Sequence, residues 1–173
     1  FEKIILEKND FEFVIDRDWI AYHKQRDVWI SNKFIDMFGK KRSYSEDITQ
    51  HHKNIAAALQ LRLEEVVLNQ LRKARKEFGL KKLCIAGGVG LNCSLNGKIE
   101  SSGIFDEIFV QPASGDDGVS YGACLLAYKK KFGLLKPKKM HNFYKGPASS
   151  DEVIKNAIAK SNIAFEEPAD IYK

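Results

Sequence analysis

The stretch "LCIAGGVGLNCSLNG", residues 83–97, joins a short apolar run to a glycine turn and then to a segment with helical character. The apolar run is bounded by lysine and glycine, which predicts a buried strand over residues 83–86. The glycines Gly87, Gly88 and Gly90 predict a turn whose backbone N–H groups lie at the start of a helix. Such a turn favours an anion such as a phosphate. It can equally be a plain tight turn, and the spacing alone leaves both interpretations open.

A second strand and a second polar loop follow along the chain. "FDEIFVQP", residues 105–112, predicts a strand closed by its proline, and the helix between the two strands is expected to end near Gly103. Strand, loop, helix and strand over residues 83–111 predict a βαβ unit with parallel strands. The loop "SGDDG", residues 114–118, then lies at the same sheet edge as the glycine turn, where open α/β sheets bind ligands. The sequence therefore predicts an α/β fold with two functional loops side by side.

The longest periodic segment covers residues 47–78 and predicts a long helix that ends at Gly79. Arg62, Glu64 and Glu65 lie mostly off its apolar stripe, so we expect them to face solvent. Shorter patterns predict a strand over 11–16 and a helix between Ser31 and Gly39. They also predict an extended connection over 134–149, a helix capped by Ser149 or Ser150, and a final strand over 163–167. A further helix is predicted after residue 118, with the small residues Ser120, Gly122 and Ala123 in its first turns. Small residues would let the helix after residue 118 lie close to a neighbour or a ligand.

Composition limits the class of protein. The chain has 173 residues, 44% of them apolar, and a net charge of +5, which suits one domain or one lobe of a larger one. The basic clusters lie near expected helix C-termini, where cations complement the helix dipole, so a nucleic-acid partner is not expected. No apolar run approaches the roughly 18 residues of a membrane span. Residue 1 is Phe, which suggests a fragment of a longer chain.

The cysteines indicate a reducing compartment. Cys84, Cys93 and Cys124 are odd in number and contain no CxxC pair, which argues against a zinc site. We therefore expect a cytoplasmic location.

The glycine loop fits neither familiar phosphate-binding motif. Residues 88–93 read GxGxxC, so the third glycine of a dinucleotide fingerprint is missing, and no P-loop Lys and Ser or Thr follow. Asn92 and Asn96 lie four residues apart and share a helix face, where they can bind a sugar hydroxyl or a phosphate. The alternative is that Asn92 caps the helix and Asn96 lies on the surface.

The acidic loop places Asp116 and Asp117 between two glycines at a helix start. A divalent cation would neutralise the two carboxylates and bridge to phosphate oxygens, and oxygen ligands favour magnesium or manganese. Added histidines would favour iron or zinc. The alternative is a helix cap, which stabilises by about 1 kcal/mol.

These motifs together resemble the O-carbamoyltransferase family, which includes nodulation-factor and antibiotic-tailoring enzymes. The resemblance rests on "GGVGLNCSLNGKI" and "FDEIFVQPASGDDGVSYGACLLAY", and it extends to "HHKNIAAALQLRLEEVVLNQL" upstream and "FYKGPASSDEVIKNAI" downstream. It is weakest over residues 1–30. The resemblance implies a ribonuclease-H-like lobe of an actin-like ATPase fold, related to the enzyme that builds threonylcarbamoyladenosine on transfer RNA.

The resemblance also implies a reaction and a site. In the family, a separate C-terminal domain makes carbamoyl adenylate from carbamoyl phosphate and ATP, and the actin-like domain transfers the carbamoyl group to a hydroxyl of a sugar or similar acceptor. By resemblance, Gly87, Gly88, Val89 and Asn92 face the nucleotide, and Asp116 is a ligand of a divalent metal. That metal is iron(II) in the related enzymes, with magnesium or manganese as alternatives. No side chain is an obvious general base, and Asp117 is a candidate by proximity alone.

The sequence departs from the family pattern in three ways. The family's HxxxH metal motif is absent, because His23, His51, His52 and His141 have other spacings, and the adjacent pair His51 and His52 is expected to be surface polar residues. Gly90 stands where the family usually has Ala, which we expect to loosen the turn. Nothing after residue 150 resembles the carbamoyl-phosphate domain.

We therefore interpret residues 1–173 as a single lobe, inactive without the remaining lobe and the C-terminal domain as partners. Two other interpretations stay open. One is an ATPase or sugar-phosphorylating enzyme of the same fold. The other is a non-catalytic RNA-binding or protein-docking module that uses the lysine clusters.

Overall fold

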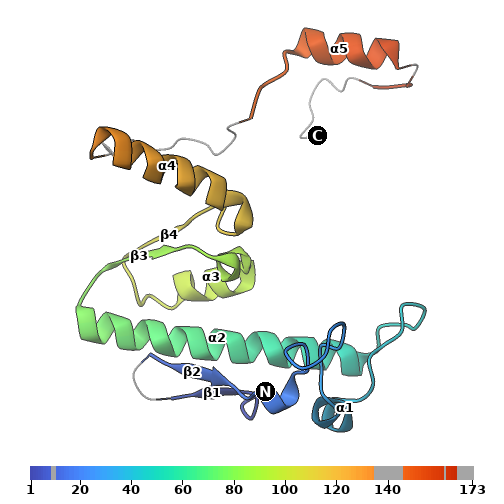
Figure 1. Cartoon of the computed structure of the whole chain (residues 1–173), viewed down its shortest axis with the longest axis vertical. Coiled ribbons are helices and arrows are strands. Elements are labelled where there is room, and N and C mark those ends of the chain that lie inside the picture. The colour runs from blue at the N-terminus through green and yellow to red at the C-terminus, as the bar shows by residue number, and fades with distance from the viewer. Residues whose placement is uncertain (9–10, 135–145, 162, 167–173) are drawn as a thin grey trace. The chain divides into compact units, whose positions relative to one another are not determined.

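A computed structural model describes residues 1–8, 11–134, 146–161 and 163–166 (Figure 1). The chain divides into two units, Phe1–Leu135 and Lys136–Lys173. The first unit holds an antiparallel pair, β1 (Ile5–Glu7) and β2 (Phe13–Ile15), and a parallel pair, β3 (Lys82–Ile85) and β4 (Glu107–Val110). Its helices are α1 (Asn32–Phe38), α2 (Gln50–Phe78), α3 (Cys93–Ser101) and α4 (Val119–Phe132), with short 3-10 turns at η1 (Arg17–Trp19), η2 (Gly88–Leu91) and η3 (Asp116–Gly118). The second unit holds α5 (Asp151–Lys160).

The mixed α/β class predicted from the sequence is confirmed. Within the described ranges each sheet has two strands, so the assignment to a ribonuclease-H-like lobe of an actin-like fold stays a prediction. The long helix is confirmed as α2, and Gly79 ends it in the left-handed conformation at φ 65°. None of the described helices is long and apolar enough to span a membrane.

The two histidines at the start of α2 both make contacts of a structural kind. Nδ1 of His52 accepts the backbone N–H of Thr49 at 3.1 Å, so this side chain satisfies a donor at the helix start. Nε2 of His51 lies 2.7 Å from the carbonyl oxygen of Phe38, the last residue of α1. His51 is exposed and His52 is half-buried, which agrees with the prediction of surface polar residues for the first and in part for the second.

The predicted βαβ unit is present, and its strands are parallel. Lys82 pairs with Glu107 and Ile85 with Val110, and the carbonyl of Ile85 accepts the N–H of Gln111 at 3.0 Å. The glycine loop and the acidic loop therefore both leave the sheet at its carboxyl edge.

One part of the small core of the first unit lies where α2 meets α3 (Figure 1), and Ile4 and Trp19 are buried in the N-terminal segment. Leu95 and Ile99, one turn apart on α3, are 2% and 1% exposed, and Val66 of α2 is also buried. Full burial of a Leu or Ile side chain contributes about 1.5–3 kcal/mol. This apolar contact fixes α3, and with it the glycine loop, against the middle of α2.

A hairpin of β1 and β2 binds another side of α2 through polar contacts. Arg62 donates from Nε and Nη2 to the carbonyl of Ile5, at 3.1 and 2.8 Å, and from Nη1 to Glu7 at 3.2 Å. Asn69 also donates to Glu7, at 3.1 Å. The predicted strand over 11–16 is confirmed as β2, whereas β1 was not predicted.

The expectation that the polar residues of α2 face solvent is wrong for its middle. Glu64 is 3% exposed, and Arg62 and Glu65 are half-buried. The reason is that α2 has neighbours on two sides, the hairpin and the βαβ unit (Figure 1). A single apolar stripe predicts only one covered face.

The other predicted elements have mixed outcomes. Ser31 and Ser150 are confirmed as N-caps of α1 and α5, because their hydroxyls accept the N–H of Phe34 and of Val153. The predicted final strand is wrong for residues 163–166, which have no regular structure, since no described strand pairs with them. Glu167 and most of the predicted connection over 134–149 lie outside the described residues.

Helix α4 confirms the helix predicted after residue 118, but its small residues do not pack closely within the described ranges. The structure buries none of the residues of α4, and a Cβ added at Gly122 would meet no atom within 4 Å. Leu126 of the same helix is 68% exposed.

Candidate functional site

The glycine loop and the acidic loop contact each other, as the sequence predicts. The N–H of Gly87 donates to the carbonyl of Ser114 at 2.8 Å. From the acidic loop, a Cβ at Gly115 would lie 3.4 Å from the Cδ1 of Leu91. The loops that follow β3 and β4 therefore form one continuous surface at the carboxyl edge of the parallel pair (Figure 1).

Gly90 is packed tightly rather than loosely. It is buried, and an added Cβ would lie 3.0 Å from the Oγ of Ser114 and 3.1 Å from its Cβ. The expectation that glycine loosens the turn at this position is therefore corrected, because here it permits a close approach of the two loops. The Oγ of Ser114 is itself buried and has no hydrogen-bond partner among the described residues.

Asn92 caps α3, which is one of the two roles that the sequence left open. Its Oδ1 accepts the N–H of Leu95 at 3.0 Å, and its amide forms two hydrogen bonds with the amide of Gln60, at 3.0 and 2.9 Å. Asn92 stays half-buried at the loop. A ligand role for this residue is compatible with the cap, since its Nδ2 carries a second hydrogen.

Asn96 is half-buried, so the alternative of a surface residue holds only in part. Its Nδ2 donates to the carbonyl of Gly90 at 2.8 Å, which braces the glycine loop from the first turns of α3. Its Oδ1 is buried without a partner among the described residues. Both asparagines on this helix face therefore hold the loop in place.

Two residues of α2, Gln60 and Glu64, connect to the loop through Asn92, and the sequence analysis assigned a site role to neither. Glu64 accepts from Nε2 of Gln60 at 2.8 Å and from the ammonium of Lys98. The hydrogen bonds from Lys98 and then from Gln60 lower the pKa of Glu64 below its ordinary value. A signal existed, because Gln60 and Glu64 are spaced i, i+4 on one face of the predicted helix.

The aspartates of the acidic loop do not cap the helix that follows them. Asp116 and Asp117 form the first turn of η3 and are exposed, and no side chain caps η3 or α4. The position of Gly118 is tightly restricted, since an added Cβ would lie 2.0 Å from the carbonyl oxygen of Ala113. The capping alternative for this pair is therefore wrong, and both carboxylates remain available to a ligand.

The described residues do not form a complete metal centre by themselves. They contain no group of three His, Cys, Asp or Glu side chains that could hold an ion. Asp116 can therefore act only as one ligand among others. The three cysteines are free and exposed.

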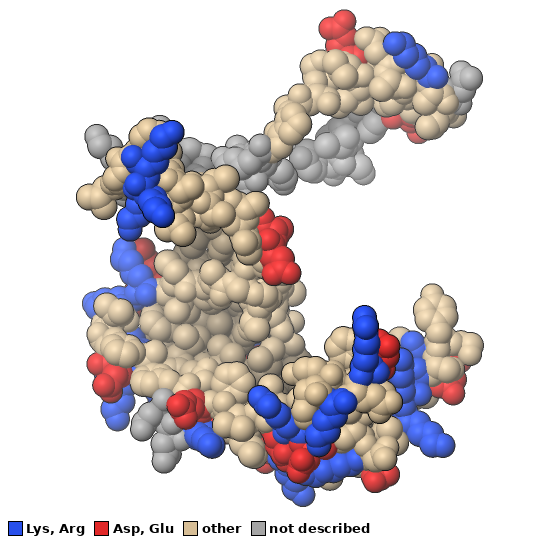
Figure 2. Space-filling model, viewed as in Figure 1, with Lys and Arg blue, Asp and Glu red and all other residues tan. Residues whose placement is uncertain are grey.

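The two ends of α4 carry opposite surface charge (Figure 2). Lys129, Lys130 and Lys131 lie in its last turn, and Figure 2 shows basic side chains at that end and acidic ones at the start, where η3 lies. The α2 helix likewise carries Arg75 and Lys76 in its last turn. The placement of both clusters agrees with cations that complement helix dipoles.

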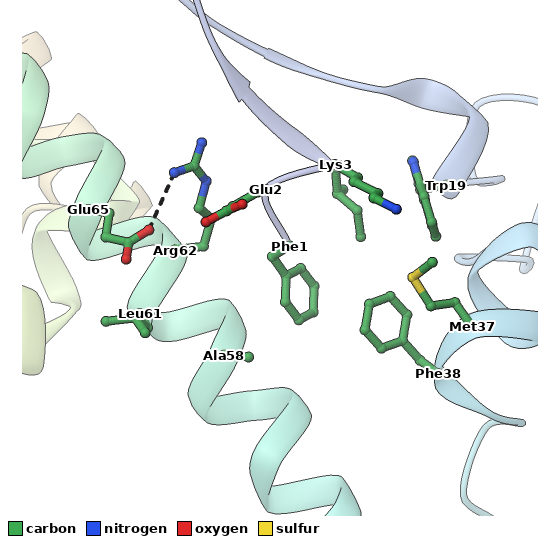
Figure 3. A pocket seen from close by; sticks show the side chains of 11 residues that line it. Phe1, Glu2, Lys3, Trp19, Met37, Phe38, Ala58, Leu61, Arg62 and Glu65 are labelled. Carbon is green, nitrogen blue, oxygen red and sulfur yellow. Dashed lines mark hydrogen bonds and ion pairs between the residues drawn. The ribbon is translucent and has the colours of Figure 1, made fainter.

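A cavity of about 390 Å³ lies apart from the two loops, between the N-terminal segment, α1 and α2 (Figure 3). Phe1 and Phe38 stack in it with ring centroids 5.2 Å apart, and Trp19 lies beside them. Arg62 and Glu65 border it from α2. No residue of the glycine loop or the acidic loop lines this cavity, so it is separate from the candidate site.

Comparisons with known proteins match the region that carries both loops. Residues 3–125 match the family described as Carbamoyltransferase N-terminus. The chain is 45% identical over 105 residues to nodulation protein NolO of Bradyrhizobium diazoefficiens, covering 60% of this chain and 19% of that protein. It is 42% identical over 112 residues to nodulation protein NolNO of Sinorhizobium fredii, covering 64% and 16%. It is 40% identical over 129 residues to the uncharacterized protein sll1178 of Synechocystis, covering 72% and 21%.

The chain thus spans about a fifth of the length of these relatives, whereas the family match covers most of the chain, from β1 into α4. The chain therefore belongs to the Carbamoyltransferase N-terminus family.

Proposed function

We propose that this chain is part of an O-carbamoyltransferase that moves a carbamoyl group from carbamoyl adenylate to a hydroxyl of a sugar or natural-product acceptor. The family match and the nodulation relatives support carbamoyl transfer. The observation that carries the site is the contact of the two loops, where the N–H of Gly87 donates to the carbonyl of Ser114 at 2.8 Å. The proposal includes the relationship to the transfer-RNA enzyme, the actin-like fold and a cytoplasmic location.

The glycine loop suits the nucleotide part of that substrate. Gly88 and Val89 open η2, where the first N–H groups of a helical turn have no partner within the turn. Such N–H groups favour phosphate oxygens. Val89 is 54% exposed, so this end of the loop is accessible.

The acidic loop suits a cation. Asp116 is exposed, makes no capping hydrogen bond and lies in the loop that contacts the glycine loop. We propose it as one ligand of a divalent metal, iron(II) first and magnesium or manganese as alternatives. The other ligands would come from outside the described residues, since these hold no group of three.

The proposed reaction asks mainly for positioning. The acceptor oxygen bonds to the carbamoyl carbon, the bond from that carbon to the phosphate oxygen of the adenylate breaks, and the hydroxyl proton leaves to a base. The tetrahedral species carries a developing oxyanion, and backbone N–H groups aimed at such an oxyanion stabilise it by a few kcal/mol. The remaining parts of the enzyme, carbamoyl phosphate and ATP are partners in this proposal.

The test is a calorimetric titration of the intact protein with a non-hydrolysable ATP analogue, with and without iron(II) or manganese(II). We expect the metal to tighten binding by the wild type and Asp116→Ala to abolish that gain. The matched control is Asp36→Ala, which changes an exposed aspartate of α1. Equal binding by Asp116→Ala and the wild type at every metal concentration would contradict the metal role. Phosphoryl transfer from ATP to an alcohol without carbamoyl phosphate would favour a kinase instead.

A further inference from the structure

A network of hydrogen-bonded polar side chains connects the interior of the first unit to the glycine loop. This polar network consists of Lys98, Glu64, Gln60 and Asn92. Glu64 is 3% exposed and accepts from the ammonium of Lys98 and from Nε2 of Gln60. Nε2 of Gln60 also donates to Oδ1 of Asn92 at 3.0 Å, and Oε1 of Gln60 accepts from Nδ2 of Asn92 at 2.9 Å. The polar network thus links α2 to the cap residue of α3 through side chains alone.

The direction of every hydrogen bond in the polar network is fixed from both of its ends. An ammonium can only donate and a carboxylate can only accept, so Gln60 must turn its NH₂ group toward Glu64. At the other end, the N–H of Leu95 can only donate, and it is bonded to Oδ1 of Asn92 at 3.0 Å. Each end therefore requires the same orientation of the Asn92 amide.

We infer that Gln60 and Glu64 are positioning residues that make Asn92 a hydrogen-bond donor to an oxygen of the bound nucleotide, a phosphate or hydroxyl oxygen. The Oδ1 of Asn92 already accepts two hydrogen bonds, whereas its Nδ2 has one hydrogen beyond the bond to Gln60. This inference rests on the proposed function, because it assumes a nucleotide at the glycine loop.

The burial of Glu64 in the polar network supports a role for this residue beyond packing. A buried carboxylate destabilises a fold unless it is paired and hydrogen-bonded, and Glu64 is both. An apolar side chain at residue 64 would satisfy the packing of α2 on α3 but would remove the acceptor that holds the NH₂ group of Gln60 from the α2 side. Glu64 and the cap of α3 therefore act together to fix which group Gln60 presents to Asn92.

The first test is Asn92→Asp in the intact protein. Aspartate has the same shape, is an equally good N-cap and still accepts from Gln60, but it cannot donate and it repels a phosphate. We expect a lower Tm, because the second carboxylate oxygen would face Oε1 of Gln60 with no proton between them, and at least a tenfold loss of affinity for the non-hydrolysable ATP analogue at a temperature where the variant is folded. Wild-type affinity in Asn92→Asp would overturn the donor role, because a residue that only caps the helix tolerates this change.

The second test compares Gln60→Ala with Gln60→Glu. Alanine removes both hydrogen bonds between the amides of Gln60 and Asn92, which we call the clamp. We expect this loss to weaken nucleotide binding about fivefold. Glutamate matches glutamine in shape but cannot donate to Oδ1 of Asn92, so we expect a larger loss than with alanine. A milder effect of glutamate would mean that only the volume of Gln60 matters and would overturn the inference. Gln70→Ala, on the same helix but bonded to the carbonyl of Phe11, is the matched control and should bind as the wild type does.

A third measurement needs no nucleotide. The side-chain NH₂ signal of Asn92, identified by its loss in Asn92→Asp, reports the clamp directly by NMR. We expect Gln60→Ala to speed the hydrogen exchange of this NH₂ group at least tenfold, and Gln70→Ala to leave it unchanged. Unchanged exchange in Gln60→Ala would overturn the positioning role. If the wild type binds no nucleotide, the proposed function fails and the donor role fails with it, while faster exchange would still support the clamp.

Discussion

The two sides of α2 hold their neighbours in different ways. On the hairpin side, Arg62 and Gln70 donate to the backbone carbonyls of Ile5 and Phe11. The carboxylate of Glu7 also accepts there, from Arg62 and Asn69. On the side of the βαβ unit, Gln60 contacts another side chain, that of Asn92. Backbone carbonyls are the same whatever residue carries them, and a carboxylate accepts through either oxygen, so the hairpin side fixes a position. Contacts between side chains depend on which groups face each other, so the loop side also fixes an orientation.

This difference has a direct consequence for mutations. Changes on the hairpin side should lower the free energy of unfolding and leave the folded glycine loop unchanged. Changes on the loop side should alter the site even where they cost little stability.

Arg62→Ala should be the most destabilising change on α2. The side chain of Arg62 is 13% exposed, donates twice to the carbonyl of Ile5 and pairs with Glu7 and Glu65 at 3.2 and 3.3 Å. Loss of these charged hydrogen bonds should lower the free energy of unfolding by about 3 kcal/mol. Urea unfolding measures it, with Arg72→Ala, an exposed position on the same helix, expected to cost about 0.5 kcal/mol. Equal costs for the two variants would mean that the hairpin side contributes little.

Gly90→Ala tests the contact between the two loops. The added Cβ would lie 3.0 Å from Oγ of Ser114, so we expect a loss of about 1–2 kcal/mol in the free energy of unfolding. In a Ser114→Gly background the same change should cost less, because the crowded atoms are gone. A double-mutant cycle measures this coupling, and strictly additive effects would argue that the loops do not touch.

The stability contributed by Glu64 should disappear in acid. The hydrogen bond from Lys98, followed by that from Gln60, lowers the pKa of Glu64 in the folded protein. This contribution is therefore fully present above the pKa of the unfolded chain, about 4.3, and is lost as the pH falls through the lower folded-state value. Glu64→Gln should be less stable at neutral pH by about 1 kcal/mol and should lose less stability on acidification.

Thermal unfolding between about pH 6 and pH 3 measures how much stability the wild type and Glu64→Gln each lose on acidification. The pKa of Asp16 is also lowered, first by the backbone N–H of Asp18, so an Asp16→Asn variant separates the two carboxylates. Parallel pH curves for the wild type and Glu64→Gln would contradict the role given to the hydrogen bonds of Glu64.

Local signals predicted most of the helices. Ser31, Gly79 and Ser150 define helix ends through hydrogen bonds or backbone conformations that a few neighbouring residues determine. The strand β1 escaped prediction because its contacts with β2 and with Arg62 depend on residues farther along the chain. The burial of Glu64 escaped prediction for a similar reason, since it depends on a second neighbour of α2.

The candidate site was predictable in its layout and not in its contacts. Parallel strands end at one edge of a sheet, so the loops after β3 and β4 had to be neighbours. The fit of Gly90 against Ser114 and the bond from Asn96 to the carbonyl of Gly90 depend on distances across the fold. No periodicity or turn motif encodes those distances.

The most direct test measures nucleotide affinity on both sides of α2 in the same experiment. Gln60→Ala and Arg62→Ala are prepared in the intact protein and titrated with the non-hydrolysable ATP analogue at a temperature where both variants are folded. We expect Gln60→Ala to weaken binding about fivefold and Arg62→Ala, although less stable, to bind as the wild type does. Equal losses, or a larger loss in Arg62→Ala, would show that α2 supports the loop only through general stability.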